Sequence, residues 1–188
     1  MSLRSGVALL LLVAGCTREA APPEQADAVT ADEAAPAARP PLAGGAVDRS
    51  HKGEAAPAAQ LADMDGEPVA FASFRGKPVL VNLWATWCAP CVAEMPTIDR
   101  AAAALAGKTA VVALNQGEDA AKVRAFLAGK PLAHARPLLD GDMTVSVRLA
   151  ANLPTTILYD AAGRELWRVT GARDWSSPAS LQLIGEEG

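Results

Sequence analysis

The feature that most constrains the fold is an almost unbroken apolar run, Val79 to Trp84 (VLVNLW), which follows Lys77-Pro78. Apolar residues in direct succession, rather than in alternation with polar ones, are typical of a strand that is buried on both faces of a sheet. The stretch that follows, from about Ala89 to Ala106, is predicted to be a helix that ends at Gly107. A buried strand that leads directly into a helix indicates an α/β protein.

Apolar spacing and turn residues predict the other elements of the chain. They are a short strand at 68–71, a buried strand at 109–114, a helix at 118–128, a short strand at 137–139, a helix at 145–150, two hairpin strands at 155–159 and 165–169, and a helix at 176–184. Their order indicates a central mixed β-sheet flanked by helices. Parallel strands come first in this sheet, and an antiparallel hairpin comes last.

The first sixteen residues, 1–16, are organised like a secretory signal peptide, because Arg4 precedes a short apolar run that ends in small residues. The run is too short to span a bilayer, which needs roughly 20 apolar residues. Val13-Ala14-Gly15-Cys16 resembles the lipobox of bacterial lipoproteins, which implies that cleavage leaves Cys16 as a lipid-linked N-terminus. The alternatives are an ordinary signal peptide with a chance cysteine and a cysteine that forms a disulfide. The lipobox resemblance implies a protein outside the cytoplasm, in the periplasm, that a lipid anchors to the inner or the outer membrane.

Residues 17–57 differ sharply in composition from the rest of the chain. They are rich in alanine and proline, contain no aromatic residue, and show neither a helical nor a strand period. Too little large apolar surface is present to offset the entropy of ordering, so a disordered tether is predicted. An alanine-rich helix is the alternative, but Pro22, Pro23 and Pro36 oppose it. The remaining residues, 58–188, are enough for one domain with its own core.

Two cysteines stand where the first buried strand turns into its helix, in Trp87-Cys88-Ala89-Pro90-Cys91. A C-x-x-C pair can close a disulfide within one helical turn or open into two thiols. Cys88 would lie at the helix N-terminus, where free N–H groups and the helix dipole stabilise a thiolate. Cys91 would be more buried and less acidic. We therefore expect Cys88 to attack a disulfide and Cys91 to resolve the resulting mixed disulfide.

Other roles for the cysteine pair remain alternatives. A zinc site would need more ligands, and His51 and His134 stand in no recognisable ligand spacing. A purely structural disulfide across two residues would constrain little. A metallochaperone that holds Cu(I) between two thiolates is the main rival from another functional class.

Several motifs together resemble the thioredoxin superfamily, and within it the TlpA/ResA-like branch of membrane-tethered periplasmic thiol–disulfide oxidoreductases. They are NLWATWCAPC at 82–91, Glu94-Met95-Pro96, NLPTT at 152–156, the turn at 160–163, and GARDW at 171–175. The resemblance implies a thioredoxin fold for 58–188 and a reaction that needs no organic cofactor. It also implies a cis peptide bond before Pro154, for which the start of an edge strand is the alternative.

The resemblance also assigns roles to residues around the cysteine pair. Pro154 would face the disulfide, and the backbone groups of Leu153 and Thr155 would pair with an incoming peptide. Trp87 would shape the docking face together with the dipeptide Ala89-Pro90, although ordinary core burial is the alternative for the tryptophan.

Two acidic residues match acids of the same branch. Glu94 lies one helical turn after Cys91, where a carboxylate would raise the thiol pKa; a solvated helix glutamate is the alternative. Glu118 resembles a second acid of the branch, but a glutamate at a helix N-terminus is the simpler explanation.

These observations predict a lipid-anchored reductase that works outside the cytoplasmic membrane. Its partners would be client proteins with disulfides, such as copper-site assembly proteins or apocytochromes c, and a membrane thiol–disulfide electron donor. The net charge of −4 and the lack of a Lys/Arg cluster argue against nucleic acid. The loop Ala150-Ala151-Asn152-Leu153-Pro154 lacks the Gly-x-x-Gly-x-Pro-Glu pattern of cytochrome-maturation proteins. The direction of electron flow stays open, so a disulfide donor or isomerase is a further alternative.

Overall fold

The computed structural model describes residues 42, 44–149 and 151–187, and the predicted signal peptide with Cys16 and most of the predicted tether lie outside them. The described chain forms, in order, β1 (Gln60–Ala62), β2 (Pro68–Ala70), the 3₁₀ helix η1 (Phe71–Phe74), β3 (Val79–Trp84), α1 (Ala89–Ala104), β4 (Ala110–Gln116), α2 (Ala120–Ala128), β5 (Arg136–Asp140), α3 (Thr144–Arg148), β6 (Thr155–Tyr159), β7 (Glu165–Thr170) and α4 (Pro178–Glu187). No described helix is long and apolar enough to cross a bilayer.

The strands form one mixed sheet in the order β2-β1-β5-β4-β3-β6-β7. β3, β4 and β5 run parallel, whereas β6 pairs antiparallel with both β3 and β7. This arrangement confirms the predicted α/β fold with a mixed sheet flanked by helices. β3 has neighbours on both sides and all six of its residues are buried, as the unbroken apolar run predicts.

Several elements begin or end at residues other than the predicted ones. α2 begins at Ala120, because Asp119 is its N-cap and accepts a hydrogen bond from the backbone N–H of Lys122. Phe71 opens η1 instead of ending β2. β1 was not predicted at all, since three residues are too few to show a strand period.

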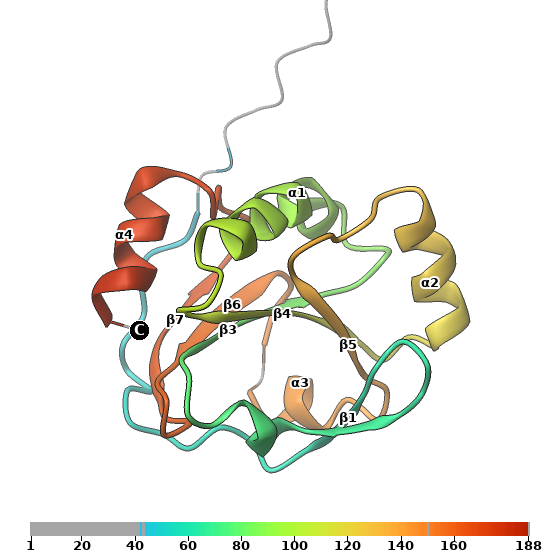
Figure 1. Ribbon diagram of the computed structural model, residues 1–188, viewed down its shortest axis with the longest axis horizontal. Coiled ribbons are helices and arrows are strands. Elements are labelled where there is room, and N and C mark those ends of the chain that lie inside the picture. The colour runs from blue at the N-terminus through green and yellow to red at the C-terminus, as the bar shows by residue number, and fades with distance from the viewer. Residues whose placement is uncertain (1–41, 43, 150, 188) are drawn as a thin grey trace, which may run out of the picture. The chain divides into compact units, whose positions relative to one another are not determined.

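Helices cover both faces of the sheet (Figure 1). α1, α2 and α4 lie on one face, and η1 and α3 lie on the other. On the first face, Trp84 of β3 and Val123 of α2 form a buried cluster with both cysteines. The cysteine pair is therefore part of the core between α1 and α2, not part of an isolated surface loop.

The predicted domain boundary at residue 58 is too late. Residues 44–57, here called the N-terminal strap, run along the outer edge of β7. Asp48 and Arg168 exchange backbone hydrogen bonds of 2.8 and 2.9 Å, and the backbone N–H of Ala56 donates to the carbonyl oxygen of Gly163 at 2.9 Å. These contacts cover the edge of the sheet at β7. Because they are made by main-chain groups, the amino-acid composition of the segment gives no sign of them.

Candidate active site

The two cysteines of the C-x-x-C pair form a disulfide at the N-terminus of α1. Cys88 is the N-cap of the helix, and its Sγ accepts a hydrogen bond from the backbone N–H of Cys91 at 3.3 Å. Cys88 is 5% exposed, whereas Cys91 is fully buried. An incoming sulfur can therefore reach Cys88 first, and the unpaired N–H groups of the first helical turn lie where a thiolate would form.

Residues beside the disulfide present an open surface. Trp87 is 67% exposed, so core burial is wrong for this side chain. Ala89 and Pro90, the first two residues of α1, are also exposed. A large exposed aromatic side chain next to a reactive sulfur supplies contact area for a partner. The part of these three residues in binding clients stays a prediction.

The segment before β6 lies at the same end of the sheet as the disulfide. The Leu153–Pro154 peptide bond is cis, which confirms the conformation expected from the family resemblance. Thr155 lies opposite Leu83, near the end of β3 that leads to Cys88. The carbonyl oxygen of Pro154 accepts a hydrogen bond of 2.9 Å from the backbone N–H of Gly171. Two segments distant in the sequence thus meet at one end of the two neighbouring strands β3 and β6.

Glu94 is fully buried, so the alternative of a solvated helix glutamate is wrong. Its Oε1 accepts a hydrogen bond from Asn82 Nδ2 at 2.8 Å. Its Oε2 accepts bonds from the backbone N–H of Arg173 at 2.9 Å and from Trp175 Nε1 at 3.2 Å. Burial raises the pKa of Glu94 to about 7, since it outweighs these three hydrogen bonds, which lower the pKa.

The position of Glu94 on α1 makes its proton relevant to the thiols. Residues three apart on a helix are neighbours, with Cβ atoms roughly 5–6 Å apart, and Cys91 is three residues before Glu94. Near neutral pH this carboxyl group can hold or release a proton beside the cysteine pair.

Glu118 lies on the side of the cysteine pair opposite to Glu94. It precedes the N-cap of α2, and its hydrogen bonds show that a helix N-terminus alone does not explain it. It is 8% exposed and accepts hydrogen bonds from both the backbone N–H (2.7 Å) and the hydroxyl (2.6 Å) of Thr86. Asn115 Nδ2 donates to it at 2.8 Å, and Lys122 Nζ lies 2.7 Å away. Burial raises the pKa of Glu118, but the bonds from Asn115, Lys122 and Thr86 outweigh it and lower the pKa to about 2. This carboxylate anchors the turn that leads from β3 to Cys88.

Asn82 was overlooked as a candidate site residue, although the sequence carries a signal for it. It is the single polar residue in the apolar run of β3. Fully buried, it donates to Thr156 Oγ1 at 2.9 Å as well as to Glu94. Its amide oxygen has no hydrogen-bond partner among the described residues. Asn82, a polar residue inside a buried strand, is therefore one of the groups that orient Glu94.

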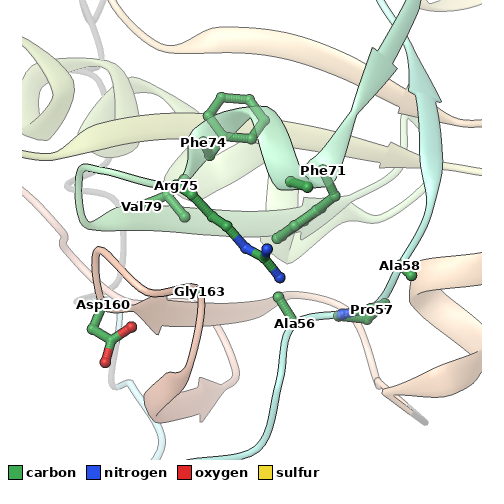
Figure 2. A pocket seen from close by; sticks show the side chains of 10 residues that line it. Ala56, Pro57, Ala58, Phe71, Phe74, Arg75, Val79, Asp160 and Gly163 are labelled. Atoms are coloured by element: carbon green, nitrogen blue, oxygen red, sulfur yellow. The ribbon is translucent and has the colours of Figure 1, made fainter.

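Figure 2 shows a pocket that neither cysteine lines. Phe71, Phe74 and Arg75 line it from η1 and the residue after it, and Ala56 lines it from the strap. Val79, another lining residue, is the first residue of β3, whereas the cysteines follow the last. This pocket is therefore at the end of β3 opposite to the disulfide.

Comparisons with known proteins agree with this geometry. The sequence model of the Redoxin family matches residues 51–181. The chain is 36% identical over 116 residues to the thioredoxin-like protein YneN of Bacillus subtilis (strain 168), which covers 60% of this chain and 67% of that protein. It is 31% identical over 120 residues to the thiol-disulfide oxidoreductase ResA of Geobacillus thermodenitrificans (strain NG80-2), which covers 63% of this chain and 69% of that protein.

A solved structure extends the likeness to the fold. A Chlorobium tepidum protein described as a DsbE thiol:disulfide interchange protein superposes with a TM-score of 0.62 at 27% identity. The match covers 72% of this chain and 94% of that chain. It therefore includes nearly the whole of the other protein.

Proposed function

This chain belongs to the Redoxin family and is a thiol–disulfide oxidoreductase of the TlpA/ResA-like kind, and from that premise we propose that it reduces disulfides in client proteins outside the cytoplasmic membrane. One observation carries the proposal: the Cys88–Cys91 disulfide caps a helix with only Cys88 accessible. This arrangement provides one sulfur for attack and a second, shielded sulfur for resolution.

The proposed reaction proceeds in two exchange steps. In the reduced protein, the Cys88 thiolate attacks one sulfur of a client disulfide, which forms a mixed disulfide and releases the other client sulfur as a thiolate. The Cys91 thiol then loses its proton and attacks Cys88 Sγ, which releases the second client sulfur. Two electrons pass to the client, and the Cys88–Cys91 disulfide is left to be reduced again by a membrane thiol–disulfide donor.

Glu94 is proposed to hold the proton that this cycle moves. Its pKa near 7 means that both protonation states are populated at neutral pH. While Glu94 is protonated, no carboxylate charge next to Cys91 opposes formation of a thiolate. Once it is ionised, it can take up the Cys91 proton before the resolving attack.

The client is proposed to dock across the exposed surface beside Cys88. Trp87, Ala89 and Pro90 provide one side of this surface. On the other side, the backbone groups of Leu153 and Thr155 next to Pro154 would pair with an extended client peptide, as in strand addition. Copper-site assembly proteins and apocytochromes c with C-x-x-C-H motifs are the proposed client classes.

A lipid on Cys16 is proposed to hold the protein at a membrane, with residues 17 to about 43 as the connection to the domain. The lipobox-like Val13-Ala14-Gly15-Cys16 supports this part of the proposal. Several acyl chains give firm anchoring where one chain binds only marginally. Cys16→Ser should move the full-length protein from the membrane fraction to the soluble fraction in its host, and an unchanged distribution would contradict the anchor.

Trapping the mixed disulfide tests the proposed reaction. Reduced Cys91→Ser protein, mixed with a peptide whose C-x-x-C-H motif is oxidised, should accumulate a stable covalent adduct at Cys88 because the resolving sulfur is gone. Cys88→Ser is the matched control and should form little adduct, since Cys91 is fully buried. Equal trapping by both variants would contradict the assignment of the attacking sulfur.

A further inference from the structure

A buried ion pair on β7 faces the side of the sheet opposite to α1. Arg168 Nε donates to Glu165 Oε1 and Arg168 Nη2 donates to Glu165 Oε2, both at 2.6 Å. The two side chains are 10% and 2% exposed, respectively. This two-pronged geometry fixes the guanidinium plane, which a single contact would leave free to turn.

An irregularity in the β6–β7 pairing brings the two residues together. Side chains three positions apart in a regular strand point to opposite faces of the sheet. The register shifts between Leu158 and Tyr159, since Trp167 pairs with Leu158 but Glu165 pairs with Tyr159. Leu166 is the extra residue, and Glu165 and Arg168 consequently share one face.

The remaining nitrogen of the guanidinium group, Nη1, contacts the chain in front of Pro154. Arg168 Nη1 donates to the carbonyl oxygen of Leu149 at 3.2 Å, just beyond the end of α3. At the other end of the same segment, the backbone N–H of Gly171 donates to the carbonyl oxygen of Pro154 at 2.9 Å. Both contacts originate at β7 and the residue after it. β7 and the residue after it therefore contact the chain in front of β6 at two points, Leu149 and Pro154.

The ion pair lies apart from the thiol chemistry. β7 pairs with β6 and β6 with β3, so one whole strand separates Arg168 from the strand that leads to Cys88. Trp167 and Val169, the neighbours of Arg168 on β7, face the opposite side and join the core beneath α1 and α4. A change confined to the ion pair should therefore leave the sulfur atoms and the α1 N-terminus in place.

We propose that Arg168, oriented by Glu165, is a positioning residue. Through its hydrogen bond to Leu149 it keeps the chain in front of Pro154 where the backbone groups of Leu153 and Thr155 can pair with a client peptide. This inference rests on the proposed docking of clients at Leu153 and Thr155. It predicts that loss of the ion pair slows exchange with peptide disulfides but not exchange with a small disulfide that needs no docking.

The test compares two oxidants of the reduced, full-length protein. One is a peptide with an oxidised C-x-x-C-H motif, and the other is dithiobis(nitrobenzoate), a small aromatic disulfide. In Arg168→Leu/Glu165→Leu both charges are removed together, so no uncompensated buried charge remains. The rate constant with the peptide should fall about tenfold or more, since small displacements of positioning groups have effects of this size, whereas the rate with the small disulfide should stay within about twofold.

Arg164→Leu is the matched control. Arg164 directly precedes β7 and also donates to a backbone carbonyl, that of Gly53 at 2.9 Å, but this carbonyl belongs to the strap and not to the chain in front of Pro154. Both rates should stay at the wild-type level in this variant. Arg168→Lys provides a second test if the double variant does not fold, because lysine keeps the charge but not the three-pronged geometry. Its rate with the peptide should also fall.

Three results would overturn the inference: a wild-type peptide rate in the folded double variant, a wild-type peptide rate in Arg168→Lys, or an equal loss of both rates. The last result would assign the ion pair a general structural role. If the wild-type protein itself reacted with the small disulfide but not with the peptide, the proposed function would fail instead. The two failures are thus distinguishable.

Discussion

Two buried glutamates on either side of one disulfide differ in what surrounds them. Glu118 accepts from the N–H and hydroxyl of Thr86 and from Asn115, and it pairs with the cation of Lys122. Glu94 is more buried, and its donors among the described residues are all neutral N–H groups. The pKa of Glu118 consequently falls to about 2, while burial raises the pKa of Glu94 to about 7.

The comparison shows how one residue type can serve two purposes at one site. A carboxylate that stays ionised at every physiological pH is suited to hold the turn before Cys88. A carboxyl group that titrates near neutral pH is suited to exchange a proton. Burial and the hydrogen-bond partners around each carboxyl group, rather than position on a helix, decide which purpose each glutamate serves.

Removing the charge of Glu118 should have the largest effect on stability. At pH 8, Glu118→Gln should lower the free energy of unfolding of the oxidised protein by about 3 kcal/mol, because a pKa lowered from 4.5 to about 2 is worth about 1.4 kcal/mol per unit. The new amide group would also face donors at Thr86 and Asn115. Urea denaturation measures the effect, and a loss below about 1 kcal/mol would contradict the anchoring role.

Glu94→Gln is the counterpart and should behave in the opposite way. An uncharged amide avoids the burial of a charge, and the Asn82 amide can turn so that its unpartnered oxygen accepts from the new NH₂ group. Glu94→Gln should therefore be neutral or stabilising at pH 8. A loss as large as that of Glu118→Gln would remove the distinction between the two residues.

The two glutamates should change the free energy of unfolding in opposite directions as the pH rises. Glu118 is ionised more readily in the folded than in the unfolded state, so stability rises as the pH increases from about 2 to 4.5. Glu94 keeps its proton in the folded state up to about pH 7, so stability falls by about 3 kcal/mol between pH 4.5 and 7. Above pH 7 its contribution is constant.

Each limb should disappear with its own variant. Thermal or urea unfolding across pH 2–9 should show that Glu94→Gln flattens the decline between pH 4.5 and 7 and leaves the acid limb unchanged. Glu118→Gln should flatten the acid limb alone. If Glu94→Gln left the decline intact, the pKa of Glu94 would have to be near its ordinary value.

The smallest expected effect concerns the cation beside Glu118. Lys122 Nζ lies 2.7 Å from Glu118 Oε1, but the lysine side chain is 55% exposed. Lys122→Met should therefore cost only about 0.5 kcal/mol, as is usual for exposed pairs, and 1 M salt should reduce the difference further. Arg124→Met, on the same helix, removes another exposed cation from its own pair with Asp65 and so shows the size of an ordinary surface ion pair. A loss near that of Glu118→Gln would show that Lys122, not the neutral donors, holds Glu118 ionised.

The sequence predicted those elements whose residues carry a local pattern. The run from Val79 to Trp84 is typical of a buried strand, and the helical stretch after it placed the C-x-x-C pair at a strand–helix junction. The hairpin of β6 and β7 was predicted for the same reason, because each strand has its own apolar pattern and a turn separates them. The cis conformation at Pro154 followed from the family resemblance alone.

Contacts between distant segments were not predictable from local patterns. The strap lies on β7 through main-chain hydrogen bonds, which no local pattern in residues 44–57 predicts. The donors that distinguish Glu118 from Glu94 include Thr86, 32 residues away, and Trp175, 81 residues away. The Arg168–Glu165 pair depends on a register shift in the sheet. Each of these arises only once the strands are paired.

The central claim, that Cys88 and Cys91 form a reducing dithiol, is tested most directly by their reduction potential. The protein without residues 1–16 would be equilibrated at pH 7 with thiol–disulfide buffers of defined potential, and the fraction of the Cys88–Cys91 disulfide would be determined. A value near about −270 mV, which is typical of thioredoxin, is predicted for a reductant of client proteins. A value near about −120 mV, which is typical of a strong oxidant, would contradict the claim and reverse the direction of electron flow.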